Sequence, residues 1–213
     1  MKNKLVRVRS GAYVTNTYFI FDDNGHCLII DPACSFDKSA NILNGHTLAL
    51  LILTHGHLDH TYDCDLYKEK YGAKLFIHEN ETNYLSDVRY NSPDGVPKGY
   101  LNKVFSADFT FSDGYTFDFG EDTYTVIHTP GHTEGSCCIY TSGVLFSGDT
   151  LFRHSIGRTD FPYGCSEEKM YTSLKRIFEI IPDDTIVYPG HGFQTTLGEE
   201  KRNNPFLRLI YDH

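Results

Sequence analysis

Four side chains of the kinds that bind divalent metal ions lie within six residues of one another, at His55, His57, Asp59 and His60. Imidazole nitrogen and carboxylate oxygen are donors that zinc takes at about 2.0–2.2 Å, and a cluster this tight can supply two neighbouring ions. Gly56 removes a side chain where the backbone must turn tightly. The pattern predicts a metal site, and a polar loop rich in histidine is the simpler alternative.

Three further candidate ligands follow predicted strands, and each has a glycine next to it. Sites in α/β sheets tend to form where strand ends open into loops. Any of the three alone could equally be a turn residue, but their shared position at strand ends favours metal binding. They are His132 after residues 123–128, Asp149 after residues 144–146, and His191 after residues 185–188.

Short runs of aromatic and β-branched residues, separated by turn residues, predict the strands that must position these ligands. Residues 17–21 and 27–30 flank the turn sequence Asp22-Asp-Asn-Gly25 and predict a hairpin. The apolar run at 48–53 predicts a strand buried on both faces. Further strands are predicted at 74–77, 115–119, 123–128, 137–140, 144–146 and 185–188.

Helices are predicted at 35–43, at 62–71 with Gly72 as its end, and at 166–180. In the last of these, Ser166 can cap the first turn and Pro182 stops the helix. Its apolar residues fall on one face at helical spacing. They are Met170, Leu174, Ile177, Phe178 and Ile181.

The order of these elements predicts an α/β protein with two mixed sheets packed face to face and helices outside. Composition nowhere shifts sharply, so we expect a single domain over residues 1–213. Residues 79–110 are polar, contain the loop sequence Ser92-Pro-Asp-Gly-Val-Pro97, and predict a mobile surface excursion. Residues 151–165 predict a long loop.

Charge and composition restrict the partners. The formal net charge is −9, so we expect no binding of nucleic acid. The six cysteines form no C-x-x-C pair and are interpreted as reduced cytosolic thiols. We expect no signal peptide at the start, and the apolar run Leu48–Leu53 is too short to cross a membrane. The sequence therefore predicts a cytoplasmic protein without a membrane partner.

The remaining histidines are expected to lie outside the site. His26, His46 and His213 occupy a hairpin, a loop and the terminus, and His78 and His128 end strands as core residues or as supports for the ligands. The position of His154, in the loop after Asp149, leaves its role open, and the preferred interpretation is that it binds no metal.

The order H-x-H-x-D-H, G-H-T, G-D and G-H between about Thr54 and Gly192 resembles the metallo-β-lactamase superfamily, which implies an αββα sandwich. The similarity is greater to glyoxalase II, through Thr-Pro-Gly-His132-Thr, Ser-Gly-Asp149-Thr-Leu-Phe, Tyr-Pro-Gly-His191-Gly and the late Asn204-Pro-Phe206. That family hydrolyses S-D-lactoylglutathione and related hydroxyacyl thioesters.

The resemblance implies a division of ligands. His55, His57 and His132 would bind one ion, Asp59, His60 and His191 the other, and Asp149 would bridge them. Two zinc ions per chain are expected, with iron or manganese as alternatives. A hydroxide held between the ions would attack the carbonyl of a small-molecule thioester, because a metal lowers the pKa of bound water to about 7. Asp59 would orient this nucleophile.

Full-length glyoxalase II carries a helical C-terminal domain that supplies basic residues to glutathione. The sequence runs only seven residues past Phe206, so we expect those contacts to be missing and the chain to resemble the compact single-domain glyoxalase II-like proteins. Arg158 lies near the position where the family places a basic residue that contacts glutathione. It is therefore the candidate for substrate binding, and a salt-bridged surface arginine is the alternative.

A second relative competes, because Gly157-Arg-Thr-Asp-Phe161 also resembles the persulfide dioxygenases, which use one iron. Their ligands would correspond here to His57 or His55, His132 and Asp149. Lactonase and β-lactamase activities share the same metal chemistry, and a non-catalytic metal-binding protein or a nuclease of this fold are further alternatives. The sequence does not identify the thiol carrier, the acyl group, the metal in the cell or the oligomeric state.

Overall fold

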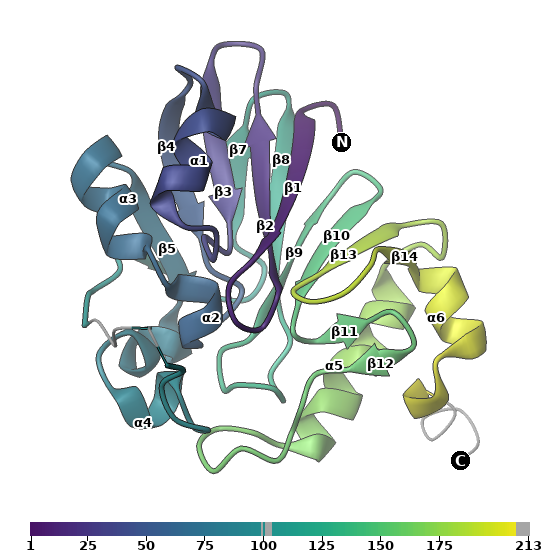
Figure 1. Ribbon diagram of the computed structural model, residues 1–213. Helices are drawn as coiled ribbons and strands as arrows, with labels where there is room; N and C mark the ends of the chain where they lie inside the picture. The colour runs from purple at the N-terminus through teal and green to yellow at the C-terminus, as the bar shows by residue number, and fades with distance from the viewer. Residues whose placement is uncertain (99, 101–103, 208–213) are drawn as a thin grey trace.

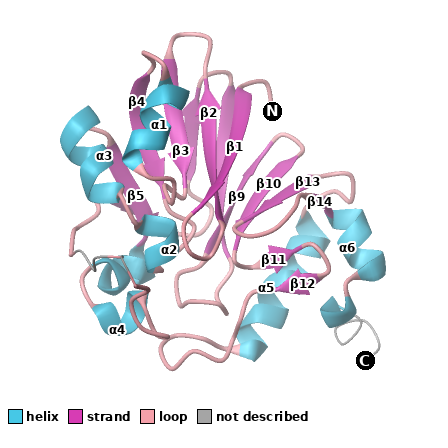
Figure 2. Cartoon of the chain, in the orientation of Figure 1, coloured by secondary structure: helices cyan, strands magenta, loops and turns pink. Residues whose placement is uncertain are grey.

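The computed structural model describes residues 1–98, 100 and 104–207 of the chain. Two six-stranded sheets pack face to face, and a small two-stranded sheet accompanies them (Figure 1). Helices lie on the outer side of each large sheet, which gives four layers in the order αββα (Figure 2). The fold is therefore the α/β architecture with two mixed sheets that the order of predicted elements indicated.

The first sheet has the strand order β1-β2-β3-β4-β5-β6. The pairs from β1 to β3 are antiparallel and those from β3 to β6 are parallel, so the sheet is mixed. The strands are β1 (Lys4–Ser10), β2 (Thr15–Phe21), β3 (His26–Ile30), β4 (Thr47–Ile52), β5 (Lys74–His78) and β6 (Phe109–Phe111).

The second sheet has the order β14-β13-β10-β9-β8-β7, and only the pair of β10 with β13 is parallel. Its strands are β7 (Thr116–Phe119), β8 (Asp122–His128), β9 (Cys137–Thr141), β10 (Val144–Gly148), β13 (Ile186–Pro189) and β14 (Thr195–Thr196). The small sheet pairs β11 (Leu151–Phe152) with β12 (Ser155–Ile156).

Seven short helical segments complete the described chain. They are α1 (Phe36–Leu43), α2 (Leu58–Thr61), α3 (Cys64–Tyr71), the 3-10 helix η1 (Glu79–Leu85), α4 (Val88–Asn91), α5 (Glu167–Ile180) and α6 (Leu197–Asn203). Within the part of the chain that the structure describes, no helix has the length and apolar character needed to cross a bilayer.

Buried apolar side chains form three clusters, one in each space between layers. One cluster joins the first sheet to its helices, for example Leu51 of β4 with Tyr67 of α3. The middle cluster joins the two sheets, for example Ile30 of β3 with Val126 of β8. The third lies between the second sheet and α5. Burial on both faces of each sheet explains why the strands are mostly apolar.

Several predicted elements are confirmed. The hairpin of β2 and β3 has the register Tyr18 opposite Ile30. The run at 48–53 corresponds to β4, whose side chains enter both the helix-facing and the sheet-facing cluster. Helix α5 begins after Ser166, whose hydroxyl accepts a hydrogen bond from the Lys169 amide at 3.2 Å, and it ends before Pro182.

Other predictions are wrong. Residues 79–110 are not only a loop, because they contain η1, α4 and most of β6. Residues 151–165 contain the pair β11–β12. The helix expected at 62–71 is present as α3, which begins only two residues later, at Cys64, and ends at Gly72 as predicted, whereas the short α2 before it was not predicted. No element was predicted for β1, β14 or α6. The polar sequence of 79–91 concealed its helices, which begin at side-chain caps from His78 and Asp87 rather than from an apolar periodicity.

Candidate metal centre

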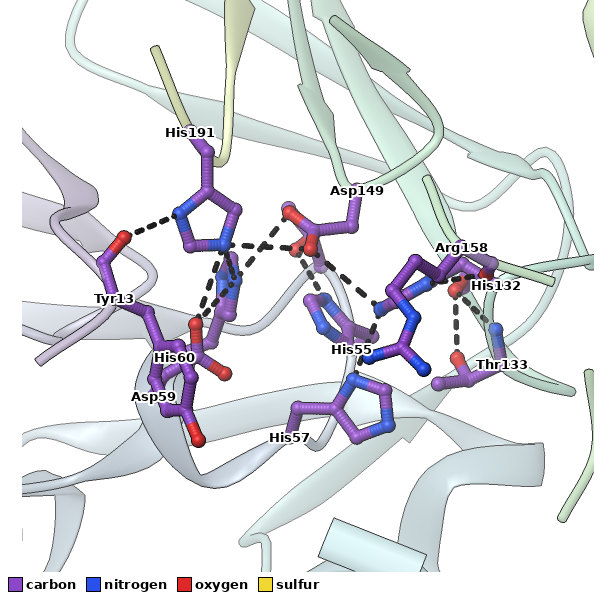
Figure 3. A network of polar contacts seen from close by, with 12 residues as sticks. Tyr13, His55, His57, Asp59, His60, His132, Thr133, Asp149, Arg158 and His191 are labelled. Carbon is purple, nitrogen blue, oxygen red and sulfur yellow. Dashed lines mark hydrogen bonds and ion pairs between the residues drawn. The ribbon is translucent and has the colours of Figure 1, made fainter. Parts of the chain in front are cut away.

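The seven predicted ligands come together where strand ends of the two sheets meet (Figure 3). His55 and His57 follow β4, and Asp59 and His60 lie on α2, the short helix that begins directly after His57. The second sheet contributes the others, each in a segment that follows a strand. They are His132 after β8, Asp149 after β10 and His191 after β13.

One group of donors consists of His55, His57 and His132, whose ligand atoms all lie within 4.8 Å of one another. His57 Nδ1 is 2.9 Å from His132 Nε2. All three side chains are buried. These are the residues that the resemblance assigned to the first ion.

The second group consists of Asp59, His60 and His191, within the same limit. His191 Nε2 lies 3.2 Å from Asp59 Oδ2 and 3.4 Å from His60 Nε2. Thr15 donates a hydrogen bond from Oγ1 to Asp59 Oδ2 at 2.9 Å and so restrains this carboxylate. These are the residues that the resemblance assigned to the second ion.

Asp149 lies between the two groups (Figure 3). Its Oδ2 is 3.5 Å from His132 Nε2 in the first group and 3.4 Å from His191 Nε2 in the second. Its Oδ1 is 3.4 Å from His60 Nε2. One carboxylate thus reaches donors of both groups, which is the geometry that a bridging ligand requires.

Hydrogen bonds at Nδ1 orient four of the five histidines. His132 Nδ1 lies 2.9 Å from the Arg158 carbonyl oxygen, and His191 Nδ1 lies 3.1 Å from that of Tyr13. A carbonyl only accepts, so Nδ1 carries a proton, and Nε2 is the ring atom directed toward the centre of the site as the candidate metal donor. His57 differs, because its Nδ1 faces the centre.

Asp31 orients the other two histidines, and sequence reasoning missed it. Its Oδ2 lies 3.0 Å from His60 Nδ1 and accepts a hydrogen bond from Thr54 Oγ1 at 2.8 Å. Thr54 Oγ1 is in turn 3.1 Å from His55 Nδ1. Asp31 is buried and directly follows β3, so the strand-end argument that identified Asp149 applied to it as well.

Two unpaired atoms provide a test of whether the site fits metal ions. Among residues with described positions, His55 Nε2 and Asp149 Oδ1 are buried and have no hydrogen-bond partner. Such an atom costs about 1–3 kcal/mol when nothing compensates it. Coordination to a divalent ion would satisfy both atoms, and five imidazoles with two carboxylates are donors that zinc, iron and manganese accept. The side chains of the site are therefore suited to bind divalent zinc, iron or manganese ions.

Protonation states of the first group agree with this fit, whereas in the second group the carboxylates favour charged histidines. Burial lowers the pKa of His57 to about 3 and holds the pKa values of His55 and His132 below the usual range, so the first group is neutral at physiological pH. Burial acts against ionisation of Asp59 too, but the charge of His60 overcomes it and lowers the Asp59 pKa to about 2. Burial disfavours the charged form of His191 as well, yet Asp149 raises its pKa to about 10, so a bound ion would have to displace a proton from His191.

Glu81, the second residue that sequence reasoning missed, ties the two loops of the first group together. Its Oε2 accepts a hydrogen bond from the Gly56 amide at 2.8 Å, and its Oε1 accepts one from the Gly135 amide at 2.7 Å. Gly56 also lets the loop approach η1, because a Cβ there would lie 2.3 Å from Tyr84 Cβ. A close approach, rather than a left-handed turn, is therefore the reason for glycine at position 56.

A cavity of about 350 Å³ opens from the metal-binding groups to the surface. Its base holds five of the candidate ligands, namely His57, Asp59, His132, Asp149 and His191. Apolar residues form much of its wall, namely Leu58, Pro93, Pro97, Phe152, Ile156 and Phe161. A small organic substrate can thus reach the ligands through a largely apolar channel.

Arg158 lies on the wall of this cavity, where substrate binding was predicted. Its guanidinium forms ion pairs with Asp94 and Asp160. Those two carboxylates raise its pKa further above the usual range, Asp160 most strongly. The residue is in place, and its role toward a substrate stays a prediction.

The other histidines lie outside both donor groups. The rings of His78 and His128 stack on each other with centroids 4.1 Å apart. His154 Nε2 lies 3.2 Å from Glu199 Oε1, so its side chain is engaged away from the ligands. His213 is outside the residues that the structure describes.

The chain is similar to several known proteins over nearly its whole length. The family model of the metallo-beta-lactamase superfamily matches residues 10–191. The probable metallo-hydrolase YqgX of Bacillus subtilis is 33% identical over 205 residues, which cover 94% of this chain and 96% of the relative. The hydroxyacylglutathione hydrolase GloC of Haemophilus influenzae is 32% identical over 209 residues, which cover 92% of this chain and 94% of the relative.

Solved structures of metallo-beta-lactamase proteins have a similar fold. BLEG-1, a B3 metallo-beta-lactamase, superposes with a TM-score of 0.88 at 32% identity, covering 96% of this chain and 99% of its own. TTHA1623 in a di-iron-bound form has a TM-score of 0.78 at 30% identity, with coverage of 95% and 100%. ETHE1 from Myxococcus xanthus has a TM-score of 0.78 at 28% identity, with coverage of 95% and 83%.

Proposed function

The chain belongs to the metallo-beta-lactamase superfamily, and from this premise we propose that it is a metal-dependent hydrolase that cleaves a thioester such as a hydroxyacylglutathione. The observation that carries the proposal is the position of Asp149, within 3.5 Å of His132 on one side and 3.4 Å of His191 on the other. A mononuclear site does not need the second group. The name of one relative, a hydroxyacylglutathione hydrolase, supports the substrate class.

Zinc is the proposed metal because its preferred donors are the imidazoles and carboxylates present here. Iron is the principal alternative, since the structural neighbour TTHA1623 was solved in a di-iron-bound form. Two divalent ions held by these residues would supply a hydroxide nucleophile at neutral pH and would stabilise the oxyanion that forms from the thioester carbonyl.

The residues of the chain then have separate tasks. Asp59 stays ionised at neutral pH because its pKa is lowered to about 2, so it accepts hydrogen bonds and orients the attacking oxygen rather than donating a proton. Thr15 holds it in that position. Phe161 packs edge-on against His57 and His132, with centroids at 5.3 and 5.8 Å, and forms the apolar wall beside these two candidate ligands.

The test combines metal analysis with hydrolysis assays. Protein loaded separately with zinc, manganese and iron is assayed with S-D-lactoylglutathione and other hydroxyacyl thioesters, with free thiol as the readout. We expect about two ions per chain in the active form. The variant Asp59→Asn should retain the fold and lose most of the kcat. No hydrolysis of any thioester by any loaded form would refute the proposal.

A second candidate function is the mononuclear iron persulfide dioxygenase that the sequence Gly157–Phe161 resembles. The structural similarity to ETHE1 from Myxococcus xanthus, with a TM-score of 0.78, favours this candidate. Oxygen consumption by iron-loaded protein with glutathione persulfide, at about one iron per chain, would support this candidate. It would also displace the hydrolase.

A further inference from the structure

The positive charge of Arg158 is already compensated by two carboxylates. Nε and Nη2 of Arg158 donate to the two oxygens of Asp160 at 2.8 and 3.0 Å, and Nη1 donates to Asp94 at 2.6 Å. Three of the five N–H groups of the guanidinium are thus used. A pair that engages both oxygens in this way is among the stronger ion pairs at a surface.

The faces of the guanidinium are restricted as well. Its Cζ lies 4.1 Å from the centroid of the Phe161 ring, over the ring face. Phe161 in turn packs against His57 and His132. Arg158 is therefore held from the side of the metal-binding groups by an aromatic ring and from its edges by Asp94 and Asp160. Its side chain is half exposed, and its charge is already paired with two carboxylates.

The charge balance of this wall is unfavourable for an anion. One guanidinium with two carboxylates leaves a net charge of −1. An incoming carboxylate that reached the two remaining N–H groups of Arg158 would lie beside Asp94 and Asp160, which repel it. No other arginine and no lysine lies among the described residues that line the cavity. Around the ion-pair cluster the wall is apolar, with Pro93 and Pro97 on one side and Phe161 on the other.

We propose that the cavity selects a thioester whose thiol portion ends in an uncharged group, and that Asp94 and Asp160 set this specificity by holding Arg158. The inference rests on the proposed function for the thioester chemistry. It keeps the hydroxyacyl thioester chemistry of the proposed function and changes the carrier, because the free glycine carboxylate of glutathione is disfavoured relative to an uncharged end. Asp94 is a specificity-determining residue on the loop after α4, far in sequence from its partner Arg158.

Measurements of ligand binding test the proposed specificity and do not require that the protein hydrolyse a substrate. Isothermal titration calorimetry of the metal-loaded protein compares S-butylglutathione with its glycine monoethyl ester, two thioethers that differ in one remote carboxylate and cannot be hydrolysed as thioesters. We expect the ester to bind about three- to tenfold more tightly. In Asp94→Asn/Asp160→Asn, which frees Arg158, the preference should reverse by about tenfold.

A matched control removes the same number of charges elsewhere. Glu121→Gln/Asp183→Asn changes two exposed carboxylates that pair with Lys2 and Lys201 and lie outside the cavity lining, and it should keep the wild-type preference. Three outcomes would each overturn the inference. The two thioethers could bind with equal affinity, or neither could bind. The wild type could also prefer the free acid, with Arg158→Gln removing that preference. A failure of thioester hydrolysis alone would count against the proposed function and would leave this comparison standing.

Discussion

His60 Nδ1 lies 3.0 Å from the Asp31 carboxylate, and both side chains are buried. The same carboxylate oxygen accepts the Thr54 hydroxyl, which lies 3.1 Å from His55 Nδ1. Asp31 therefore orients one histidine of each donor group, although it is not itself a candidate ligand. Residues behind the ligands fix the tautomer and direction of the rings, so their loss weakens metal binding without removing a ligand.

The variant Asp31→Asn tests this relationship. Asparagine has nearly the same shape and tolerates the left-handed backbone of position 31, where φ is 52°. It lacks the charge that accepts hydrogen bonds from Thr54 and His60, and we expect metal affinity to fall about 10- to 100-fold. Competition with a chromophoric chelator measures the two dissociation constants.

Asp122→Asn is the control for Asp31→Asn. Asp122 is also a buried carboxylate, and it accepts hydrogen bonds from the Lys2 and Asn3 amides, far from the ligands. The variant Asp122→Asn should lower the free energy of unfolding and leave the affinity for metal ions unchanged. Unaltered binding of both ions by Asp31→Asn would contradict the role assigned to Asp31.

The division of the ligands predicts different metal contents for three variants. His132→Ala removes a donor from the first group only and His191→Ala removes one from the second group only, so each should keep about one ion per chain. Asp149→Ala removes the carboxylate near both groups and should lower the content below either single variant. Elemental analysis after dialysis measures the number. Loss of both ions in His191→Ala would show that the sites are not separable.

The ligand positions could be predicted from the sequence because their signals are local. His55, His57, Asp59 and His60 are close together in the chain, and Asp149 and His191 each end a strand that the pattern of apolar residues predicts. The sandwich followed for the same reason, since two runs of apolar strands separated by helices have few alternatives. Neither the ligand positions nor the sandwich fold required knowledge of which distant segments are in contact.

The roles of the supporting residues could not be predicted in this way, although Asp31 does follow a predicted strand. Asp31 acts on Thr54 and His60, which are 23 and 29 residues away, and neither pairing has a signature in spacing. Arg158 could be identified as a cation near the site, but its partner Asp94 lies 64 residues earlier in a segment that was expected to be a mobile loop. Tertiary contacts decide both roles.

Gly190 predicts a steric effect on the bridging carboxylate. A Cβ at this position would lie 2.1 Å from Asp149 Oδ1 and 2.7 Å from His60 Cε1, so Gly190→Ala must displace the Asp149 side chain. We expect metal affinity to fall at least about tenfold. Zinc titration of refolded protein measures the change.

Gly143→Ala is the control for Gly190→Ala. A Cβ at Gly143 meets nothing within 4 Å, and its φ of +71° costs a non-glycine residue about 1 kcal/mol. This variant should lose stability and bind metal normally. If both variants bind metal as the wild type does, the close approach of Gly190 to Asp149 does not constrain the site.

Glu81 predicts a pH dependence of stability. Burial raises its pKa to about 7 from the ordinary 4.5, although the Gly56 and Gly135 amides donate hydrogen bonds to it. The native protein therefore binds this proton more tightly than the unfolded chain, and between pH 4.5 and 7 it holds more protons. The contribution is fully present below about pH 4.5 and is lost as pH rises through 7.

The variant Glu81→Gln isolates this effect, because glutamine does not titrate and the histidines contribute equally to both proteins. The free energy of unfolding of the wild type, relative to that of Glu81→Gln, should decrease by about 2–3 kcal/mol between pH 5 and pH 8. Urea unfolding at constant excess metal measures it. The exposed Glu121→Gln should keep the wild-type slope. Parallel pH profiles for wild type and Glu81→Gln would mean that Glu81 is ionised in the native protein throughout, held by its two amide donors, and that the proton does not couple to folding.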